Sequence, residues 1–470
     1  FSREERYSTS LLSPFSNRMG KVLSTPEPAD WIPIPIPRES AGGPSKSGKS
    51  GRSSAKDNKS QSQKPSDKPT EKGTEKGAEN GSDEYSGEYE PEWRNDLCGA
   101  EIIPGAVPWE GPQRITTCQL DEPTQTRFKE LLDRIFTEEV FIGKKVVFYV
   151  HEIQEVINAV MPILQSEPML IEDVPFDISI VGDLHGQFYD LYRLFKSDSK
   201  DGKPGWECMK YLFLGDYIDR GRQSLEIMMS LFIIKCLYPD RIFLLRGNHE
   251  FYRINKRYGF LYEIDERIRP WKTAKSIFLL FNEAFSWMSI AAIVGNIYFC
   301  SHGGIATSGF TRQHMRGLYK PVYLATEDSL IQDITWSDPA GGLRGSAYNK
   351  DRGASIFFGF DELCKALASM EVVAIFRGHT KAKAGYNNQW NVCFTIFTAT
   401  NYEASHSPGA VAYIGPTGKV DIQLLMEDKI RTKWEARIRA VEYFTKKVEK
   451  KNKGAEAGDK KPADAKPTPK

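Results

Sequence analysis

The sequence predicts an α/β fold with a second sheet, spanning residues 114–425. Two observations lead to this prediction. Short apolar runs of strand length, most of them bounded by Gly, Asp or Asn, alternate with stretches whose apolar residues have helical spacing. Hydrophobic residues make up 40% of the 470-residue chain and concentrate in this range, so a sizeable core can form. Strands that alternate with helices indicate an α/β core, and the later strands indicate a second sheet.

The elements follow in order along this range. Helices are expected first at 128–136 and 152–164. The strand-like runs are 176–181, 211–214, 241–245, 296–300, 372–376 and 392–398. Helical patterns lie between the earlier runs, at 188–196, Ser224–Leu237 and 272–285.

Both ends of the chain differ in composition from this range. Residues 1–113 read as a mostly disordered extension, because 38–92 are rich in Ser, Gly, Lys, Glu and Pro and carry almost no aliphatic residues. The strip at 31–37 alternates proline with isoleucine after Trp31, which favours either an extended polyproline segment or a plain linker. Residues 426–453 predict a basic amphipathic helix that packs on the domain, with calmodulin or a membrane surface as the alternative partner. Residues 454–470 read as a disordered tail.

Charge and cysteine content narrow the function classes. With 63 basic and 62 acidic residues, the chain gives no electrostatic reason to expect nucleic acid as a partner. No uninterrupted apolar stretch is long enough for a membrane-spanning helix, and residues 1–20 do not resemble a secretory signal. The seven cysteines form no Cys-x-x-Cys pair. These features favour a reducing compartment, and we expect the cytoplasm, the nucleus or both.

Five of the strand-like runs lead into residues that can bind metals. These segments are Gly182-Asp183-Leu184-His185-Gly186, Gly215-Asp216-Tyr217-Ile218-Asp219-Arg220-Gly221, Arg246-Gly247-Asn248-His249-Glu250, His302-Gly303-Gly304 and Arg377-Gly378-His379. The carboxyl ends of strands are where α/β folds place their sites, and oxygen and imidazole donors suit Mn, Fe or Zn. Four of the seven histidines lie here, which core packing explains poorly. Buried carboxylates at these positions need paired charges, which a dinuclear metal site supplies.

The first three of these segments resemble the signature of the phosphoprotein phosphatase family, and the flanks, including Trp336-Ser-Asp-Pro339 and Asp351-Arg-Gly353, are most similar to its protein phosphatase 1 group. The resemblance covers about 128–423. It implies a metallophosphoesterase-type central β-sandwich flanked by helices, with a dinuclear site of two divalent ions (Mn, Fe or Zn) at the strand ends. It also implies hydrolysis of phosphoserine and phosphothreonine in protein substrates, and regulatory subunits as partners.

The resemblance assigns roles to individual residues. Asp183, His185 and Asp216 match the ligands of one ion, and the second ion matches Asp216, Asn248, His302 and His379. His249 matches a general acid that Asp219 orients, and Arg220 and Arg352 match a pair that grips the phosphate together with Asn248 and Tyr402. The implied mechanism is direct attack by a hydroxide that bridges the ions, followed by proton donation from His249 to the leaving oxygen.

The sequence also departs from the family pattern. The loop after Tyr402 reads Glu403-Ala-Ser-His-Ser-Pro-Gly409 in place of a Cys-containing acidic loop, and Thr398-Ala-Thr-Asn401 replaces Ser-Ala-Pro-Asn. The region of Val373, Ala374 and Asn388, which matches the family's groove for regulatory subunits, is less apolar here.

Two other functions are consistent with parts of this pattern. A phosphoesterase acting on nucleotides or dinucleotides would need the same metal ligands, although the similarity outside the motifs favours the protein phosphatase. A catalytically inactive scaffold that binds partners through its tails is disfavoured, because the costly buried charges are all retained. Metal analysis combined with phosphopeptide turnover would separate these functions.

The composition of the extension gives a first prediction. Removing residues 1–92 is expected to leave turnover of a short phosphopeptide nearly unchanged, because 38–92 contribute almost no apolar surface to a core. Turnover by the truncated and full-length chains, compared at equal metal loading, checks this. A truncated chain that misfolds or loses turnover would show that the extension packs on the domain.

Overall fold

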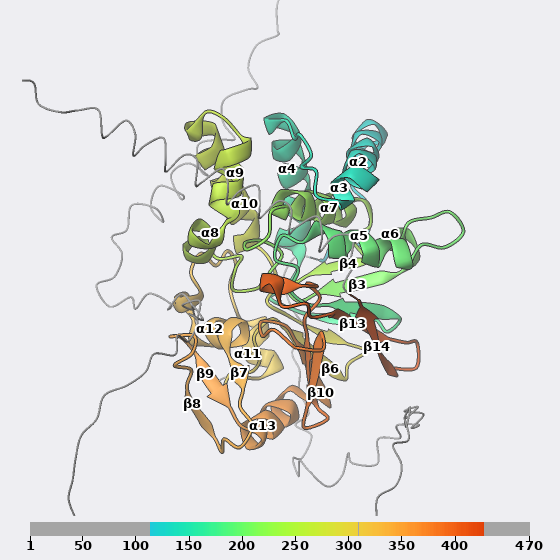
Figure 1. Ribbon diagram of the computed structural model, residues 1–470. Helices are drawn as coiled ribbons and strands as arrows, with labels where there is room; N and C mark the ends of the chain where they lie inside the picture. Colours follow the sequence, from blue (N-terminus) through green and yellow to red (C-terminus); the bar gives the residue numbers. More distant parts are fainter. Residues whose placement is uncertain (1–112, 309, 427–470) are drawn as a thin grey trace, which may run out of the picture. The chain divides into compact units, whose positions relative to one another are not determined.

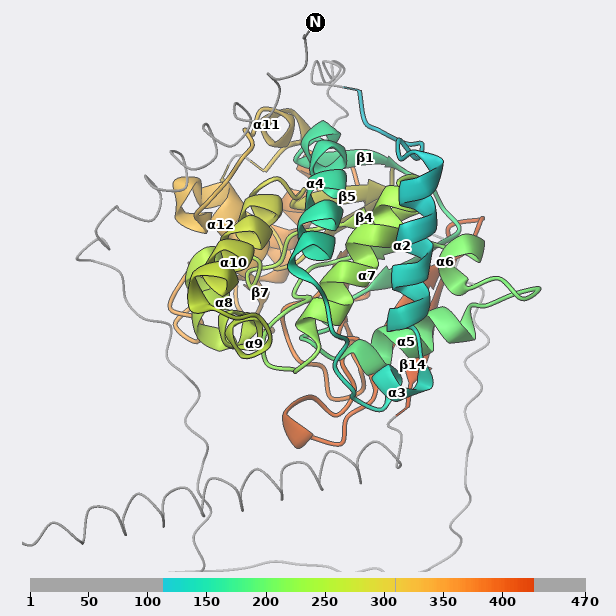
Figure 2. The ribbon, with the colours of Figure 1, turned by 90° about the horizontal axis from the view of Figure 1, so that it is seen from above.

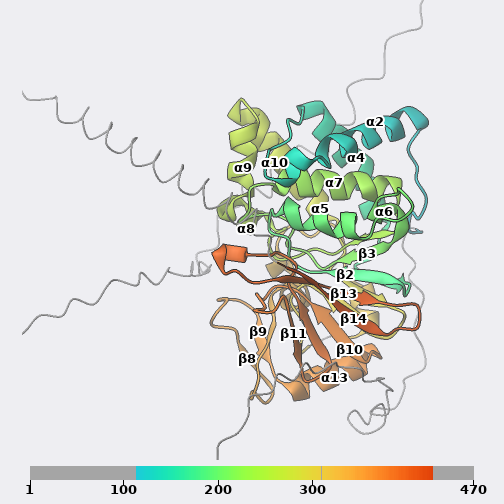
Figure 3. The ribbon, with the colours of Figure 1, turned by 45° about the vertical axis from the view of Figure 1, so that its right-hand side comes forward.

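The structure is a computed structural model that describes residues 113–308 and 310–426. Two β-sheets pack face to face, and helices cover the outer face of each (Figure 1). Figure 3 shows the same layers from the side, with most helices above the paired sheets and α13 (Phe360–Met370) below them. This confirms the predicted central β-sandwich flanked by helices.

The first sheet has five strands in the order β14 (Val420–Leu425), β13 (Gly409–Ile414), β2 (Ile178–Val181), β3 (Lys210–Phe213) and β4 (Ile242–Leu244). β2, β3 and β4 run parallel, whereas β13 pairs antiparallel with β2. The three parallel strands therefore end at the same edge of the sheet, where the first three predicted motifs follow them.

The second sheet has six strands in the order β1 (Leu170–Val174), β5 (Ala291–Val294), β6 (Tyr298–Ser301), β10 (Ala374–Arg377), β12 (Cys393–Ile396) and β11 (Tyr386–Gln389). β6, β10 and β12 run parallel to one another. A small sheet of β7 (Asp338–Pro339), β9 (Ile356–Phe358) and β8 (Ser346–Tyr348) lies apart from it.

Apolar residues between the sheets hold the sandwich together. Ile180, Leu212 and Phe243 of the first sheet and Phe376 and Ile396 of the second belong to one buried cluster. Each is almost completely buried, and fully burying a side chain of this size contributes about 1.5–3 kcal/mol. A shift of one residue in the pairing of any of these strands would turn its buried side chains away from the other sheet.

The helices divide between the two outer faces. The first sheet is covered by α2 (Glu122–Ile135), α4 (Val150–Ser166), α5 (Phe188–Ser197), α7 (Ser224–Leu237), α9 (Phe260–Arg267) and α10 (Trp271–Ser286), and Figure 2 shows this layer from above. α7 is buried along its whole length because other helices cover the side that faces away from the sheet. On the second sheet lie α11 (Arg312–Arg316), α12 (Ser329–Trp336) and α13. The shorter helices are α3 (Glu138–Phe141), α6 (Gly205–Cys208) and α8 (Tyr252–Tyr258).

All six predicted strands and all five predicted helices within the described range exist, with ends shifted by a few residues. The predicted helix at 426–453 and both terminal extensions lie outside the described residues, apart from their innermost positions. In the described range no helix is both long and apolar enough to cross a membrane.

Candidate metal centre and phosphate site

The turns that follow strands of both sheets meet at one place. His302, after β6, lies with its Nε2 3.3 Å from Oδ2 of Asp216, which follows β3 of the other sheet. The backbone N–H of His379, after β10, donates to Oδ1 of Asp183, after β2, at 2.9 Å. The sandwich therefore brings the metal-competent residues of five strand ends into one buried site.

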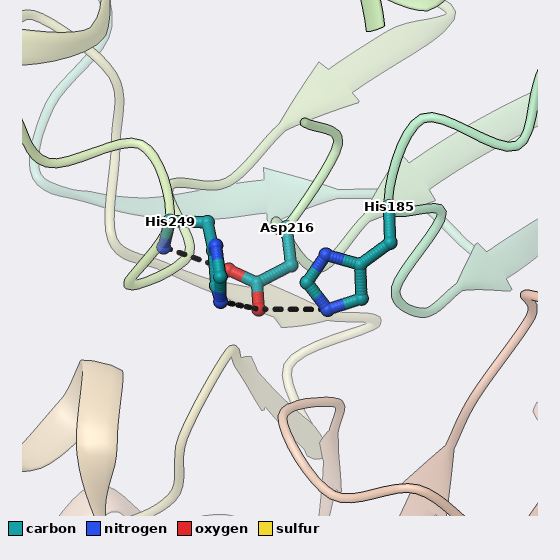
Figure 4. A group of neighbouring side chains, drawn as sticks. All are labelled: His185, Asp216 and His249. Carbon is teal, nitrogen blue, oxygen red and sulfur yellow. Dashed lines mark hydrogen bonds and ion pairs between the residues drawn. The ribbon is translucent and has the colours of Figure 1, made fainter. Parts of the chain in front are cut away.

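Asp216 is the centre of this site. Its Oδ2 lies 3.5 Å from Nε2 of His185 and 3.9 Å from Nε2 of His249, besides the contact with His302 (Figure 4). Burial opposes the charge of this carboxylate, but His302 and His249 hold its pKa well below the ordinary value. The site is thus built to keep a charged carboxylate in its middle.

Asn248 and His379 complete the second side of the site. The terminal amide of Asn248 lies 2.8 Å from Nε2 of His302 and 2.9 Å from Nδ1 of His379. Asp216, His302 and His379 form one group of donor atoms, and His185, Asp216 and His249 form another, with all atoms of each group within 4.8 Å. The two groups share Asp216, as a bridging ligand would require.

One buried donor atom fits the presence of a metal ion. Oδ2 of Asp183 lies 3.8 Å from Nε2 of His185 and is buried without a hydrogen-bond partner, which is costly in a site that binds nothing. The set of carboxylate, imidazole and amide donors suits divalent transition metals. The residues present therefore fit two ions. In the assignment that the family resemblance implies, one ion would be held by Asp183, His185 and Asp216, and the other by Asp216, Asn248, His302 and His379.

Backbone carbonyls fix the imidazoles that point into the site. Nδ1 of His185 contacts the carbonyl oxygen of Ile218 at 3.0 Å, and Nδ1 of His302 contacts that of Leu214 at 3.1 Å. A donor N–H at Nδ1 leaves Nε2 free of a proton, and Nε2 is the atom that faces Asp216 in both residues.

Backbone strain is concentrated in the same turns. Several non-glycine residues here have positive φ, among them His185 (45°), Asp216 (53°), Asp219 (69°), Arg220 (66°) and His379 (65°). Such conformations persist only where the surrounding structure enforces them, and they cluster at functional sites. Gly247 must lack a side chain, because a Cβ there would lie 2.3 Å from Oδ1 of Asp216.

Glu250 holds two of these turns together. Its buried carboxylate accepts hydrogen bonds from the backbone N–H groups of Asp216, Tyr217 and Gly247, each at 2.9 Å. In the sequence Glu250 is only the last residue of the motif at 246–250. The sequence does not show which backbone N–H groups donate to it.

We expect Glu250→Gln to destabilise the protein by about 1–3 kcal/mol, because the new amide N–H₂ faces a backbone donor that loses its acceptor. Thermal unfolding of the purified variant measures the loss. Glu130→Gln, on the exposed surface of α2, is the matched control and should unfold with the wild type. Equal unfolding temperatures for all three proteins would contradict this role of Glu250.

His249 and Asp219 form a buried pair beside Asp216. Nδ1 of His249 lies 2.6 Å from Oδ2 of Asp219, whose Oδ1 accepts the backbone N–H of Phe260 at 2.8 Å. Burial lowers the pKa of His249 to about 4 and raises that of Asp219, so it disfavours the charged forms. One proton lies between Oδ2 of Asp219 and Nδ1 of His249, whether the pair is an uncharged acid with a neutral imidazole or a carboxylate with an imidazolium. In both forms a second proton remains on Nε2 of His249, the atom that faces Asp216.

The predicted phosphate-binding residues lie around this centre. Nη2 of Arg352 donates to the carbonyl oxygen of His379 at 2.9 Å. The guanidinium of Arg220 stacks 4.6 Å from the ring centroid of Tyr258, and its Nη1 lies 3.9 Å from Oε1 of Glu403. The ring of Tyr402 stacks on His185 with centroids 5.2 Å apart. All the predicted site residues are thus neighbours, with Arg220 the most exposed of the charged ones.

Asp338 is a structural residue of the site that the sequence did not reveal. Its carboxylate accepts from Nε of Arg352 at 2.8 Å, from Nη2 of the fully buried Arg377 at 2.7 Å and from Oγ1 of Thr380 at 2.7 Å. In the sequence Asp338 is only one residue of the Trp336–Pro339 segment, and its partners lie 14 to 42 residues further along the chain.

The two threonines that depart from the family pattern also have partners. Oγ1 of Thr398 accepts the backbone N–H of Gly182 at 2.9 Å. Thr400 donates from both N and Oγ1 to the buried carboxylate of Asp190, at 2.8 Å each. They anchor the connection between β12 and β13 to the first metal-ligand turn and to α5.

The chain is similar to known phosphatases and phosphoesterases. Residues 176–382 match the family model of calcineurin-like phosphoesterases. A protein serine/threonine phosphatase from Saccharomyces cerevisiae with similarity to human phosphatase PP5 is similar in structure, with a TM-score of 0.57 and 26% identity over 64% of this chain and 96% of that one. A cold-active protein-tyrosine phosphatase of a psychrophile Shewanella aligns at a TM-score of 0.38 and 16% identity over 56% of this chain and 84% of that one. Residues 176–382 are therefore similar to calcineurin-like phosphoesterases, and their His and Asp clusters are suited to divalent metal ions.

Proposed function

We propose that this protein is a metal-dependent phosphatase that hydrolyses phosphoserine and phosphothreonine in other proteins. The single observation that carries the proposal is the convergence of two groups of possible metal donors on Asp216, one of which includes His249, the hydrogen-bond partner of Asp219. The similarity to the yeast serine/threonine phosphatase, which spans nearly all of that chain, supports the choice of substrate.

Each group of the site has a task in such a reaction. When bound, the two ions supply Lewis-acid charge and lower the pKa of a water molecule. Arg220 and Arg352 bring planar donor groups that match phosphate oxygens. His249 holds a proton at Nε2 for the departing serine or threonine oxygen, and Asp219 keeps the imidazole in place.

A substrate panel tests the proposal. The purified chain, loaded with Mn²⁺, is assayed for phosphate release from phosphoserine, phosphothreonine and phosphotyrosine peptides, from nucleotides and from dinucleotides. We expect turnover of the first two classes. Turnover confined to nucleotides or dinucleotides would replace the proposal with a nucleotide phosphoesterase, and two bound metals without any turnover would support an inactive scaffold.

The same proposal includes the subfamily, the metals, the partners and the location of the protein. From the flanking segments we infer kinship with the protein phosphatase 1 group. We further infer that the metals are Mn, Fe or Zn, that regulatory subunits are partners, and that the protein acts in the cytoplasm or nucleus. The region of the family's regulatory groove is less apolar here, since Asn388 is an exposed residue of the edge strand β11. Binding of regulatory subunits through that groove is therefore not included in the proposal.

A further inference from the structure

A cleft of about 630 Å³ lies beside the metal centre. One wall is formed by the small sheet, with Pro339 and Phe357, and the other by the β10–β12–β11 end of the six-stranded sheet, with Tyr386 and Thr395. Its volume falls in the range of about 300–1,000 Å³ that is usual for ligand sites.

The cleft begins at the phosphate site. Arg352 lines the cleft, and its guanidinium also donates to the backbone oxygen of His379, one of the candidate metal ligands. Thr380, the next residue, lines the cleft as well. A chain whose phosphorylated residue sits at the metal centre would therefore lead its neighbouring residues into this cleft.

The charges that line the cleft are predominantly positive. Four basic side chains and two acidic ones line it: Arg352, Arg377, Lys381, Lys383, Asp338 and Asp351. Asp338 pairs with both arginines, and Arg352 is proposed to contact the phosphate itself, which leaves the two exposed lysines and the exposed Asp351 as the charges available to the residues beside the phosphate. Nζ of Lys381 donates to the backbone oxygen of Tyr402 at 3.2 Å. In the described part of the chain, Lys383 makes no hydrogen bond or ion pair.

The loop that carries these lysines is anchored to the domain. Lys381 and Lys383 flank Ala382, whose side chain is buried in a cluster with Phe397, Ala399 and Tyr402. Gly385 closes the loop by donating to the backbone oxygen of Ala382 at 3.0 Å. Exposed lysines are usually solvated surface groups, but these two are held at the rim of a concave cleft next to a phosphate site.

We propose that this cleft binds the segment next to the phosphorylated residue and selects substrates with acidic side chains there, through Lys383 and, to a smaller extent, Lys381. The inference rests on the proposed phosphatase function and specifies its substrate class. Charge complementarity at a partly exposed site changes affinity by about two- to fivefold per charge at low salt, and the effect weakens as salt screens it.

The test uses the Mn²⁺-loaded full chain and phosphoserine peptides that are identical except for acidic, neutral or basic residues on either side of the phosphoserine. We expect kcat/KM to be about fivefold or more higher for the acidic than for the basic peptide, mainly through KM, and the ratio to fall in high salt. Lys383→Glu should bring this ratio to one or below, and Lys383→Ala should give an intermediate value. Lys275→Glu, on the exposed face of α10, is the matched control and should keep the wild-type ratio.

The outcomes separate the inference from the function on which it rests. If the wild type hydrolyses all the peptides equally, or if Lys383→Glu keeps the wild-type ratio, the cleft has no such selectivity and the phosphatase proposal stands. If no phosphopeptide is hydrolysed while p-nitrophenyl phosphate is, the protein phosphatase proposal itself is wrong, and the inference is wrong with it.

Discussion

Asp216→Asn is expected to abolish tight binding of both metal ions and to lower turnover by about 10³-fold or more. Asp216 is the only residue shared by the two groups of donors, and its Oδ2 is the atom that the three imidazoles surround. The substitution removes one negative charge from both ion sites, and charge stabilisation by such metals contributes several kcal/mol, where 1.36 kcal/mol is a factor of ten.

Asparagine is a suitable replacement because it changes the charge and little else. Asp216 has φ of 53°, a conformation that asparagine adopts more readily than most residues, so the turn should be retained. Asp201→Asn is the matched control, since Asp201 has the same φ of 53° in an exposed turn away from the site. Elemental analysis of the purified proteins counts the metals. Two tightly bound ions and wild-type turnover in Asp216→Asn would show that the bridging assignment is wrong.

His249→Asn is expected to lower turnover of phosphoserine peptides by about 10²–10⁴-fold while the metal content stays unchanged. The Nε2 proton of His249 is available for a leaving oxygen, because Nδ1 is engaged by Asp219 at 2.6 Å. An alkyl oxygen needs that proton when it departs, whereas an aryl oxygen leaves as a stable anion. The loss should therefore be much smaller for p-nitrophenyl phosphate.

The comparison between the two substrates distinguishes proton donation from metal binding. A residue that holds a metal would affect both esters alike and would lower the metal content. His314→Asn, on the exposed surface of α11, serves as the control for loss of a histidine. Equal losses on alkyl and aryl esters would count against proton donation by His249. Asp219→Asn should repeat the substrate dependence with a smaller loss, because Asp219 acts only through the imidazole.

Local pattern was enough to predict the elements that carry the site. The parallel strands β2, β3 and β4 are short, fully buried apolar runs or nearly so, and each ends in a glycine-containing turn. Their motifs could be read directly because a turn after a buried strand is where the chain can expose polar atoms. The helices α5 and α10 were likewise visible from the spacing of their apolar residues, whereas α7 is apolar and buried on all sides.

Elements without such a local pattern could not be predicted. β11, with the sequence Tyr-Asn-Asn-Gln, is polar and mostly exposed, and it is a strand only because β12 pairs with it. β13 does have an apolar pattern, but its place between β2 and β14 could not be predicted, because β2 is more than 200 residues away in the chain. Which strands pair over such distances depends on the side-chain packing of the assembled sheets, and the local sequence does not contain that information.

The sequence by itself located the candidate donors at the five strand ends, because each motif follows an apolar run of strand length. Only the tertiary structure decided how they act together. It placed the strand ends of two sheets against each other, so that Asp216 meets His302, and it gave the carboxylate of Asp338 to both Arg352 and Arg377. It also formed the basic cleft from segments on different sheets. Such contacts arise from packing two surfaces over a shared core, which no periodicity along the chain encodes.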